Sequence, residues 1–386
     1  MKVVVAIDSL KGSLSSLEAG NAIKESINEV ISGADVEVHP LADGGEGTVE
    51  ALTLGMGGTI ETIPVKGPLG EKVHASYGII PQRQLAIIEM AAAAGITLIA
   101  TEERNPLHTT TYVHTTTYGV GEMIKDAISK GCRHFIIGIG GSATNDGGAG
   151  MLQALGYALL DKDNQEISLG AQGLADLKSI STDKVIEELK ECDFKIACDV
   201  TNPLCGAQGC SSIFGPQKGA DEDMITKMDT WLSNYATLAT SVSEKADATI
   251  EGTGAAGGLG FAFLAFTNAT LEPGIDIILS EINIEKAISE ADLVVTGEGR
   301  LDGQTVMGKA PIGVAKLAKK YGKKVVAFSG SVTEDAILCN QHGIDAFFPI
   351  VRRLISLDEA MSKEVAYKNM KETATQVFRL INLYNH

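Results

Sequence analysis

Four glycine-rich loops in this sequence also carry acidic or basic side chains. They read DSLKG at residues 8–12, ADGGEGT at 42–48, GIGGSATNDGG at 138–148 and GQTVMGK at 303–309. Glycine lets the backbone approach a ligand closely, carboxylates hold a metal ion, and lysines neutralise the charge of a transferring phosphoryl group. Each loop alone is also compatible with a simple tight turn. Together, the four loops favour phosphoryl transfer.

The loop at residues 138–148 is compatible with two kinds of ligand. It follows the apolar run 135–137 and precedes a helix-like stretch, an order typical of phosphate sites because backbone N–H groups and the helix dipole converge there. Its glycines also match the sequence fingerprint of dinucleotide-binding loops. Asp161 lies near the position further along the chain where that fingerprint has an acidic residue. Asp146 inside the loop instead suits a phosphate carried with Mg²⁺. An NAD(P)-dependent oxidoreductase acting on a small hydroxy acid is therefore the alternative to a kinase.

The loop at residues 303–309 has the spacing of a Walker loop, with Lys309 in the place of its lysine. Ala310 stands where a Walker loop has the Ser or Thr that binds Mg²⁺, and Pro311 starts the following helix. The loop can still offer backbone N–H groups and one lysine to a phosphate. It does not form a standard Walker site.

The apolar pattern predicts the elements that must position these loops. Runs of β-branched residues alternate with segments of helical period, which is typical of a parallel sheet with crossover helices. We expect strands at residues 3–7, 36–40, 135–139, 195–200, 292–296, 324–328 and 346–351, a helix at 16–31, and an antiparallel strand pair at 73–80 and 84–90. The loops at 8–12 and 42–48 follow strands directly, where open α/β sheets bind their ligands.

The length of the chain and an interruption in its alternating sequence pattern predict two domains. A chain of 386 residues is longer than one hydrophobic core usually supports. The turn-rich stretch Lys66–Gly70 interrupts the alternating pattern, which resumes near residue 290. We therefore expect residues 1–65 and 290–386 to form one discontinuous α/β domain, with residues 66–289 inserted into it.

The composition excludes several classes of function. The formal charge of −17 and the single tryptophan disfavour binding to nucleic acid or to an anionic membrane surface. The start MKVVVAIDS is expected to be a first strand rather than a signal peptide, and no stretch approaches the roughly 20 apolar residues of a membrane span. Six cysteines without a zinc-like spacing are typical of free thiols in a reducing cytosol. We expect a cytoplasmic protein.

Six motifs, in order along essentially the whole chain, resemble those of the bacterial glycerate kinase type-1 family. They lie at residues 8–13, 42–48, 138–148, 198–204, 214–219 and 296–305. The resemblance implies ATP-dependent phosphorylation of glycerate, with the 2-hydroxyl favoured. It also implies a Rossmann-like parallel-sheet domain with an inserted flavodoxin-like α/β domain and an active site in the cleft between them. Two departures are Leu10, where the family usually has Phe, and a doubled HTTTY stretch at residues 108–119.

A kinase acting on glycerate must bind its carboxylate and accept a proton from its hydroxyl. Asp199, at the end of an expected strand, is the candidate base, although an N-cap or turn role fits it equally well. Lys11 and Arg300 are candidates to bind the substrate carboxylate or to assist catalysis, and Lys11 fits the γ-phosphate as well. Asp8 and Ser9 are further candidates for substrate binding.

The remaining assignments concern ATP and Mg²⁺. The candidate ligands for Mg²⁺ are Asp43, Glu46 and Asp302. The candidates for binding the phosphates are Gly140, Gly141, Ser142, Thr144, Asn145, Gly308 and Lys309. Lys218 is either another anion contact or a solvated turn lysine. A hinged solute-binding protein is a non-enzymatic alternative that the two-domain pattern also fits, and both a monomer and a homodimer are compatible with the sequence.

Overall fold

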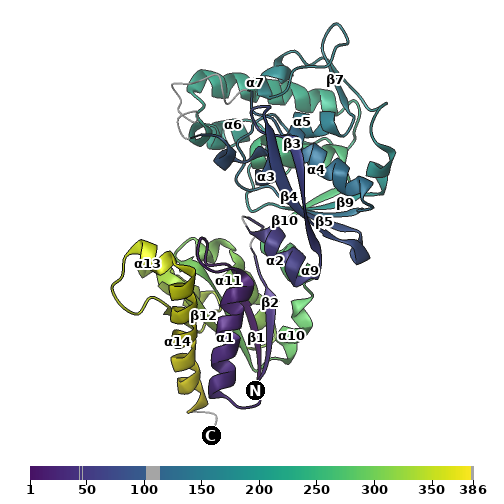
Figure 1. The fold of residues 1–386 in the computed structure, drawn as a ribbon. Coiled ribbons are helices and arrows are strands. Elements are labelled where there is room, and N and C mark those ends of the chain that lie inside the picture. Colours follow the sequence, from purple (N-terminus) through teal and green to yellow (C-terminus); the bar gives the residue numbers. More distant parts are fainter. Residues whose placement is uncertain (43, 46, 101–113, 384–386) are drawn as a thin grey trace. The chain divides into compact units, whose positions relative to one another are not determined.

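The computed structural model describes residues 1–42, 44–45, 47–100 and 114–383. The chain divides into two compact units (Figure 1). The first unit comprises residues 1–43, 50–57 and 275–386, and the second comprises residues 44–49 and 58–274. The chain therefore leaves the first unit and returns to it. Each unit is built around its own sheet, and the expected α/β architecture with parallel sheets is confirmed.

Among the described residues, the first unit has a five-stranded sheet with the order β13-β12-β11-β1-β2, and all its neighbouring strands are parallel. The strands are β1 (Lys2–Ile7), β2 (Asp35–Pro40), β11 (Leu293–Leu301), β12 (Lys324–Val332) and β13 (Ala346–Pro349). The helices lying wholly or mostly in this unit are α1 (Ser16–Val30), α2 (Thr48–Gly55), α9 (Gly274–Glu281), α10 (Ile284–Glu290), α11 (Ala310–Lys320), α12 (Leu338–Gln341), α13 (Leu357–Met361) and α14 (Lys363–Asn382).

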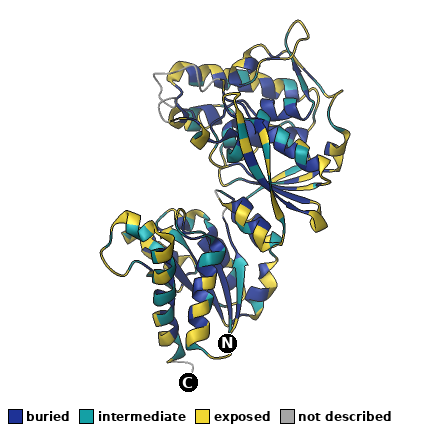
Figure 2. Ribbon diagram, viewed as in Figure 1, coloured by how far each residue is buried: buried dark blue, intermediate teal, exposed yellow. Residues whose placement is uncertain are grey.

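The core of the first unit lies between its sheet and the paired helices α1 and α14. Helix α1 begins with a capping box, in which Ser15 accepts a hydrogen bond from the Glu18 N–H and Glu18 accepts one from the Ser15 N–H. Its apolar residues Ile23 and Ile27 are fully buried, whereas its other face is exposed (Figure 2). This burial of one face explains why the helical period is readable in the sequence.

The strand order of the first unit reverses beside β1. The chain moves from β1 to β2 on one side, and from β11 through β12 to β13 on the other. The crevice at the carboxyl ends of the strands where such a reversal occurs is the usual ligand site of open α/β sheets. The backbone N–H of Asp8, just after β1, donates to the Gly297 carbonyl in β11 at 2.9 Å, so the two strand ends are adjacent.

The second unit contains a six-stranded sheet among the described residues, with the order β10-β9-β6-β5-β4-β3, together with the small pair β7-β8. Its strands are β3 (Thr59–Lys66), β4 (Lys72–Ile80), β5 (Leu85–Glu89), β6 (His134–Gly138), β7 (Ala158–Leu160), β8 (Ser179–Ser181), β9 (Asp193–Ala197) and β10 (Ala269–Glu272). Its helices are α3 (Ala91–Ala94), α4 (Tyr118–Ser129), α5 (Ala149–Ala154), α6 (Cys210–Phe214), α7 (Glu222–Ala239) and α8 (Ala255–Phe266). The antiparallel pairing of β4 with β5 is confirmed, and β5, β6, β9 and β10 are parallel.

The divisions between the units differ from those expected at residues 65/66 and 289/290. Strand β3 pairs with β4 over its whole length and so belongs to the second unit. The turn-rich stretch 66–70 is the turn of this hairpin. Helices α9 and α10 belong to the first unit almost entirely. A helical period in the sequence does not tell which sheet the helix covers.

Candidate functional site

The first unit has a pocket at the carboxyl ends of β1, β11 and β12, at the reversal of strand order. Its volume is about 440 Å³. Six charged side chains line it and form what we call its charged wall: Asp8, Lys11, Glu298, Arg300, Asp302 and Lys309. Five apolar residues also line the pocket: Leu10, Ile350, Val351, Leu357 and Met361. Sequence reasoning had singled out five of the charged residues, and the structure brings these five together.

The turn after β1 supplies the first part of the charged wall. The Asp8 side chain is buried, and its Oδ1 accepts a hydrogen bond from the Ser9 N–H at 2.7 Å. Leu10 and Leu14 then bridge across the turn and are buried, which leaves Lys11 at the exposed tip. The apolar pair therefore anchors the turn and projects a lysine into the pocket.

Gly297 allows β11 to extend over the pocket. Its φ is +151°, and a Cβ atom at this position would lie 1.8 Å from the carbonyl oxygen of Phe328. Only glycine fits this close approach. Beyond it, Arg300 pairs with Ser331 of β12, so that the end of β11 carries Glu298 and Arg300 to the pocket.

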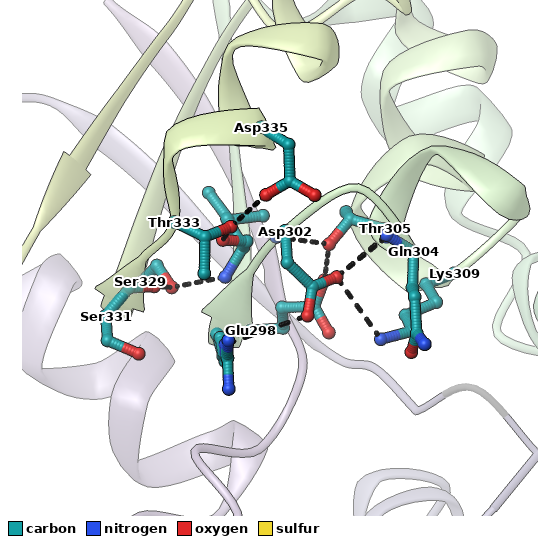
Figure 3. A network of polar contacts seen from close by, with 11 residues as sticks. Glu298, Asp302, Gln304, Thr305, Lys309, Ser329, Ser331, Thr333 and Asp335 are labelled. Carbon is teal, nitrogen blue, oxygen red and sulfur yellow. Dashed lines mark hydrogen bonds and ion pairs between the residues drawn. The ribbon is translucent and has the colours of Figure 1, made fainter.

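A hydrogen-bond network fixes the loop after β11 (Figure 3). The Thr305 hydroxyl donates to Glu298 Oε1 at 2.7 Å and accepts from the Asp302 N–H at 3.1 Å. Asp302 Oδ1 in turn accepts from the N–H groups of Gln304 and Thr305, at 2.9 and 3.2 Å. The buried Thr305 thus links Glu298 to Asp302 and helps to hold both carboxylates at the pocket.

The two cations of this loop pair only loosely with Asp302. Arg300 Nε lies 3.7 Å from the Asp302 carboxylate. Lys309 Nζ lies 3.9 Å from the same carboxylate (Figure 3). Such long and partly exposed pairs contribute little stability, so both cations can change partner at small cost. An anionic ligand entering the pocket can therefore be bound by Arg300 and Lys309 without breaking a strong ion pair.

The Walker-like loop differs from a Walker loop in the direction of its amides. It folds into a short 3₁₀ turn, Thr305–Met307, before Gly308 at φ +107° and helix α11. The N–H groups of Thr305, Met307 and Lys309 all donate to carbonyl groups of the same loop. These amides are consequently not available to a phosphate, as they are in a phosphate-binding loop of that type. The Lys309 side chain, by contrast, lines the pocket.

The pocket also offers oxygen ligands suited to Mg²⁺. This ion keeps several waters and is usually held by one or two carboxylates together with substrate phosphates. Asp8, Glu298 and Asp302 supply such carboxylates. No group of three or more His, Cys, Asp or Glu side chains within residues 1–42, 44–45, 47–100 and 114–383 is arranged to enclose a metal ion. The other two expected ligands, Asp43 and Glu46, lie outside the described residues.

The glycine-rich loop 138–148 belongs to the second unit and joins β6 to α5. Gly140 and Gly141 are exposed and Ser142 is half-buried, whereas Thr144 and Asn145 are fully buried. The Asn145 amide donates to the Ser211 hydroxyl at 2.8 Å and so fastens the loop to α6. The first half of the loop therefore reaches solvent through residues 140–142, and only these can meet a ligand.

Asp146 has a structural role that the sequence did not reveal. Its carboxylate is completely buried and accepts hydrogen bonds from the N–H groups of Thr117, Gly148 and Gly150, at 2.8, 3.0 and 3.2 Å. The Thr117 hydroxyl donates to it as well. Burial raises its pKa, while these donors act in the opposite direction. Asp146 joins the starts of α4 and α5, and its interpretation as a partner of Mg-bound phosphate is wrong because its oxygens face inward.

The threonines before α4 act differently from simple helix caps. Residues 101–113, with the first copy of the doubled HTTTY stretch, lie outside the described residues. In the second copy, Thr117 occupies the N-cap position of α4 without a side-chain cap. Its hydroxyl instead accepts from the Met151 N–H of α5 and donates to Asp146. Thr117 therefore links the starts of two helices, α4 and α5.

Asp199 and Lys218, both in the second unit, have contrasting environments. Asp199 is exposed just beyond β9, and its Oδ1 accepts a hydrogen bond from the Gly274 N–H at 3.1 Å. Lys218 is buried, and its Nζ donates to Ser142 Oγ and to the Thr144 carbonyl, at 2.8 and 2.7 Å. The interpretation of Lys218 as a solvated turn lysine is therefore wrong.

Sequence reasoning missed two features of the pocket. Glu298 was not assigned a role, although it stands between two glycines in the last part of β11, directly after the buried run of that strand. That setting is a signal that could have identified it. The apolar wall from residues 350–361 was also missed, because Leu357 and Met361 follow no strand or glycine pattern.

Comparison with known proteins identifies the family. The model of the glycerate kinase family matches residues 3–382. A glycerate 2-kinase from Escherichia coli K12 is 48% identical over 96% of this chain and 95% of its own length. A glycerate kinase from Bacillus subtilis 168 is 46% identical over 99% and 98%. A crystal structure assigned to glycerate kinase 2 from Salmonella typhimurium LT2 has a TM-score of 0.90 at 45% identity and covers 99% of this chain and 98% of that one. The chain therefore belongs to the glycerate kinase family.

Proposed function

We propose that this protein is a glycerate kinase, which transfers the γ-phosphoryl group of ATP to a hydroxyl group of glycerate and releases ADP. The observation that carries this proposal is the pocket of the first unit, where three cations and three carboxylates meet at the reversal of strand order. Cations can bind the substrate carboxylate and the phosphates, and carboxylates can bind a metal ion. The similarity to the E. coli glycerate 2-kinase favours 2-phosphoglycerate as the product.

In the proposed site, Lys11 and Arg300 bind the glycerate carboxylate, and Asp8 and Ser9 orient its hydroxyl groups. Two positions support this proposal: Lys11 lies at an exposed turn tip, and Arg300 makes a long, partly exposed ion pair with Asp302 at 3.7 Å. A bidentate arginine contact would orient the small substrate and so favour one hydroxyl group. Lys309 is proposed as a contact to the phosphate, whereas Gly308 allows the sharp turn before α11.

Mg²⁺ is proposed to bind at Asp302, together with Asp43 and Glu46. The fit rests on the carboxylate oxygens that the pocket offers, since Mg²⁺ prefers such donors. When bound, Mg²⁺ would neutralise charge on the phosphates of ATP. The chain's own contribution is the loop network through Thr305, which keeps Asp302 in place.

The exposed half of the glycine-rich loop is proposed to bind phosphates of ATP. Among the described residues, the N–H groups of Gly140, Gly141 and Ser142 donate no hydrogen bond. Gly141 has φ +71°, and consecutive N–H groups around such a residue form a typical anion site. Thr144 and Asn145 support the loop from inside. The dinucleotide alternative loses its support, because no observation on this loop favours a hydride-transferring cofactor over ATP.

Asp199 remains our proposal for the base that accepts the hydroxyl proton. It is exposed at the carboxyl end of a strand, although it also accepts the Gly274 N–H. Replacing Asp199 by Asn keeps a similar shape and one acceptor oxygen. We expect kcat to fall by about 10²- to 10⁴-fold, the usual effect of removing a general base. A folded variant with nearly full kcat would show that Asp199 is not the base.

NMR of the reaction product tests the whole proposal. Incubation of the protein with glycerate, ATP and Mg²⁺ should give a phosphorus resonance coupled to the proton on carbon 2 of the product. Coupling to the carbon 3 protons instead would move the assignment to the 3-hydroxyl group. Absence of any phosphoglycerate, together with turnover of NAD(P), would overturn the kinase proposal.

No described helix has the length and apolar composition needed to cross a membrane. We propose that the enzyme acts in the cytoplasm.

A further inference from the structure

Lys218 is a buried cation without a carboxylate partner. It lies in the short 3₁₀ turn Pro216–Lys218 and is 7% exposed. Its Nζ donates to Ser142 Oγ and to the Thr144 carbonyl, and in the described part of the chain no carboxylate lies within 4 Å of it. A buried ammonium group is costly unless an opposite charge or strong hydrogen bonds compensate it. An anion bound at the neighbouring loop would add to the opposite charge of Asp146, which acts on Lys218 without direct contact.

The contact with Lys218 determines what the Ser142 hydroxyl can do. An ammonium group is only a donor, so Ser142 Oγ must accept from it, and the serine proton stays available for another acceptor. Ser142 is half-exposed beside the exposed Gly140 and Gly141. Its hydroxyl proton and the three N–H groups of these residues thus form a set of donors on the exposed half of the loop, and Lys218 lies behind them.

We propose that Lys218 is a positioning residue for nucleotide binding: it holds Ser142 so that the serine hydroxyl and the N–H groups of Gly140–Ser142 bind an anionic oxygen of the phosphate chain of ATP. The inference rests on the proposed function, because it takes ATP to be the phosphate donor. The charge of Lys218 strengthens the hydroxyl as a donor, since a hydrogen bond from a cation polarises the group that receives it.

The proposal gives nucleotide binding a specific pH dependence. Burial lowers the pKa of Lys218 to about 8. Two titratable groups face it: Asp146, from the loop that carries Ser142, and the Cys210 thiol of α6. Burial raises the pKa of the Cys210 thiol to about 12. A bound phosphate would stabilise the protonated amine. The affinity for ATP should therefore fall as the pH rises through about 8.

Titration calorimetry with Mg-ATP, without glycerate, tests the proposal directly. At pH 7 we expect Lys218→Met to weaken binding by about 10- to 100-fold and Ser142→Ala by about 5- to 10-fold. Inorganic tripolyphosphate, which lacks the nucleoside, should lose affinity in parallel. Between pH 7 and 9, the affinity of the wild type should fall while that of Lys218→Arg stays constant, because the guanidinium remains charged.

Lys245→Met is the matched control, since Lys245 also ties two loop oxygens, those of Thr267 and Asn268, at 3.2 and 3.0 Å. It should leave Mg-ATP affinity unchanged.

If Lys218→Met does not fold, Ser142→Ala and the pH profile of the wild type still test the proposal. Unchanged Mg-ATP affinity in folded Ser142→Ala, or a raised KM for glycerate alone, would overturn the inference. Failure of the proposed function is distinguished by product NMR of the wild type, which does not depend on these variants.

Discussion

Replacing Asp146 by Asn tests whether this buried carboxylate serves the fold or the reaction. The substitution keeps size and shape but turns one carboxylate oxygen into an NH₂ group. Oδ2 accepts the N–H groups of Thr117 and Gly150, and Oδ1 accepts that of Gly148. Whichever oxygen is replaced, at least one buried N–H then faces another donor.

The size of the effect follows from these contacts. Losing one charge-assisted hydrogen bond and leaving its N–H without a partner costs about 3 kcal/mol. Burial of the charged carboxylate is unfavourable and raises the pKa of Asp146. The neutral Asn side chain removes this penalty, which offsets a part of the cost. We therefore expect the free energy of unfolding to fall by about 2 kcal/mol. For a unit of this size, that corresponds to a decrease of about 4–8 °C in the midpoint of thermal unfolding.

Thermal unfolding followed by circular dichroism measures the change, with Asp221→Asn as the control. Asp221 is an exposed N-cap of α7 that accepts one hydrogen bond, from the Met224 N–H at 2.8 Å. Asn is an equally good N-cap, so the control should lose less than about 0.5 kcal/mol. The kcat of folded Asp146→Asn should stay within about threefold of the wild-type value, because no atom of Asp146 reaches the surface. An unchanged midpoint with a hundredfold fall in kcat would refute the structural role.

Three further substitutions address the fold and the charge of Lys218. Gly297→Ala should destabilise the first unit by more than about 2 kcal/mol in chemical denaturation, because its Cβ would overlap the Phe328 carbonyl oxygen. Ser15→Ala should cost about 1 kcal/mol in the same measurement through loss of the capping box with Glu18; no loss would show that the box is dispensable. The pKa of Lys218 is lowered from 10.5 to about 8, so the unfolded state binds the extra proton between these pH values. The free energy of unfolding of the wild type should therefore rise across that window relative to Lys218→Met, by at most about 3 kcal/mol, and parallel pH profiles would contradict this.

Much of the fold was predictable because its strands are buried on both faces. Val3, Val4 and Val5 are fully buried, and such continuous apolar runs identify parallel strands from sequence alone. The position of the glycine loops after these strands then followed from the chain order. The turn at residues 66–70 was harder to interpret, because Gly and Pro mark a hairpin turn as well as a break between domains. Only the pairing of β3 with β4 distinguishes the two.

Burial of polar side chains was the part of the site that the sequence could not predict. Lys218 follows Pro216 and Gln217 in what reads as a surface turn. Its burial results from packing against Ser142 and Thr144, which lie 76 and 74 positions earlier in the chain. No local pattern encodes such a contact.

The acids of the glycine loops show why burial separates those available to a ligand from those that serve the fold. Asp146 and Asp302 both follow glycine-rich or turn-like sequence and both accept backbone N–H groups. Asp146 is fully buried, and its oxygens are surrounded by donors from two helices. The Asp302 side chain is 20% exposed, and its bonds to backbone N–H groups leave it facing Arg300 and Lys309 at 3.7 and 3.9 Å. A carboxylate in that second setting can exchange a loose cation for a bound metal ion, whereas one in the first setting cannot do so without unfolding the loop that holds it.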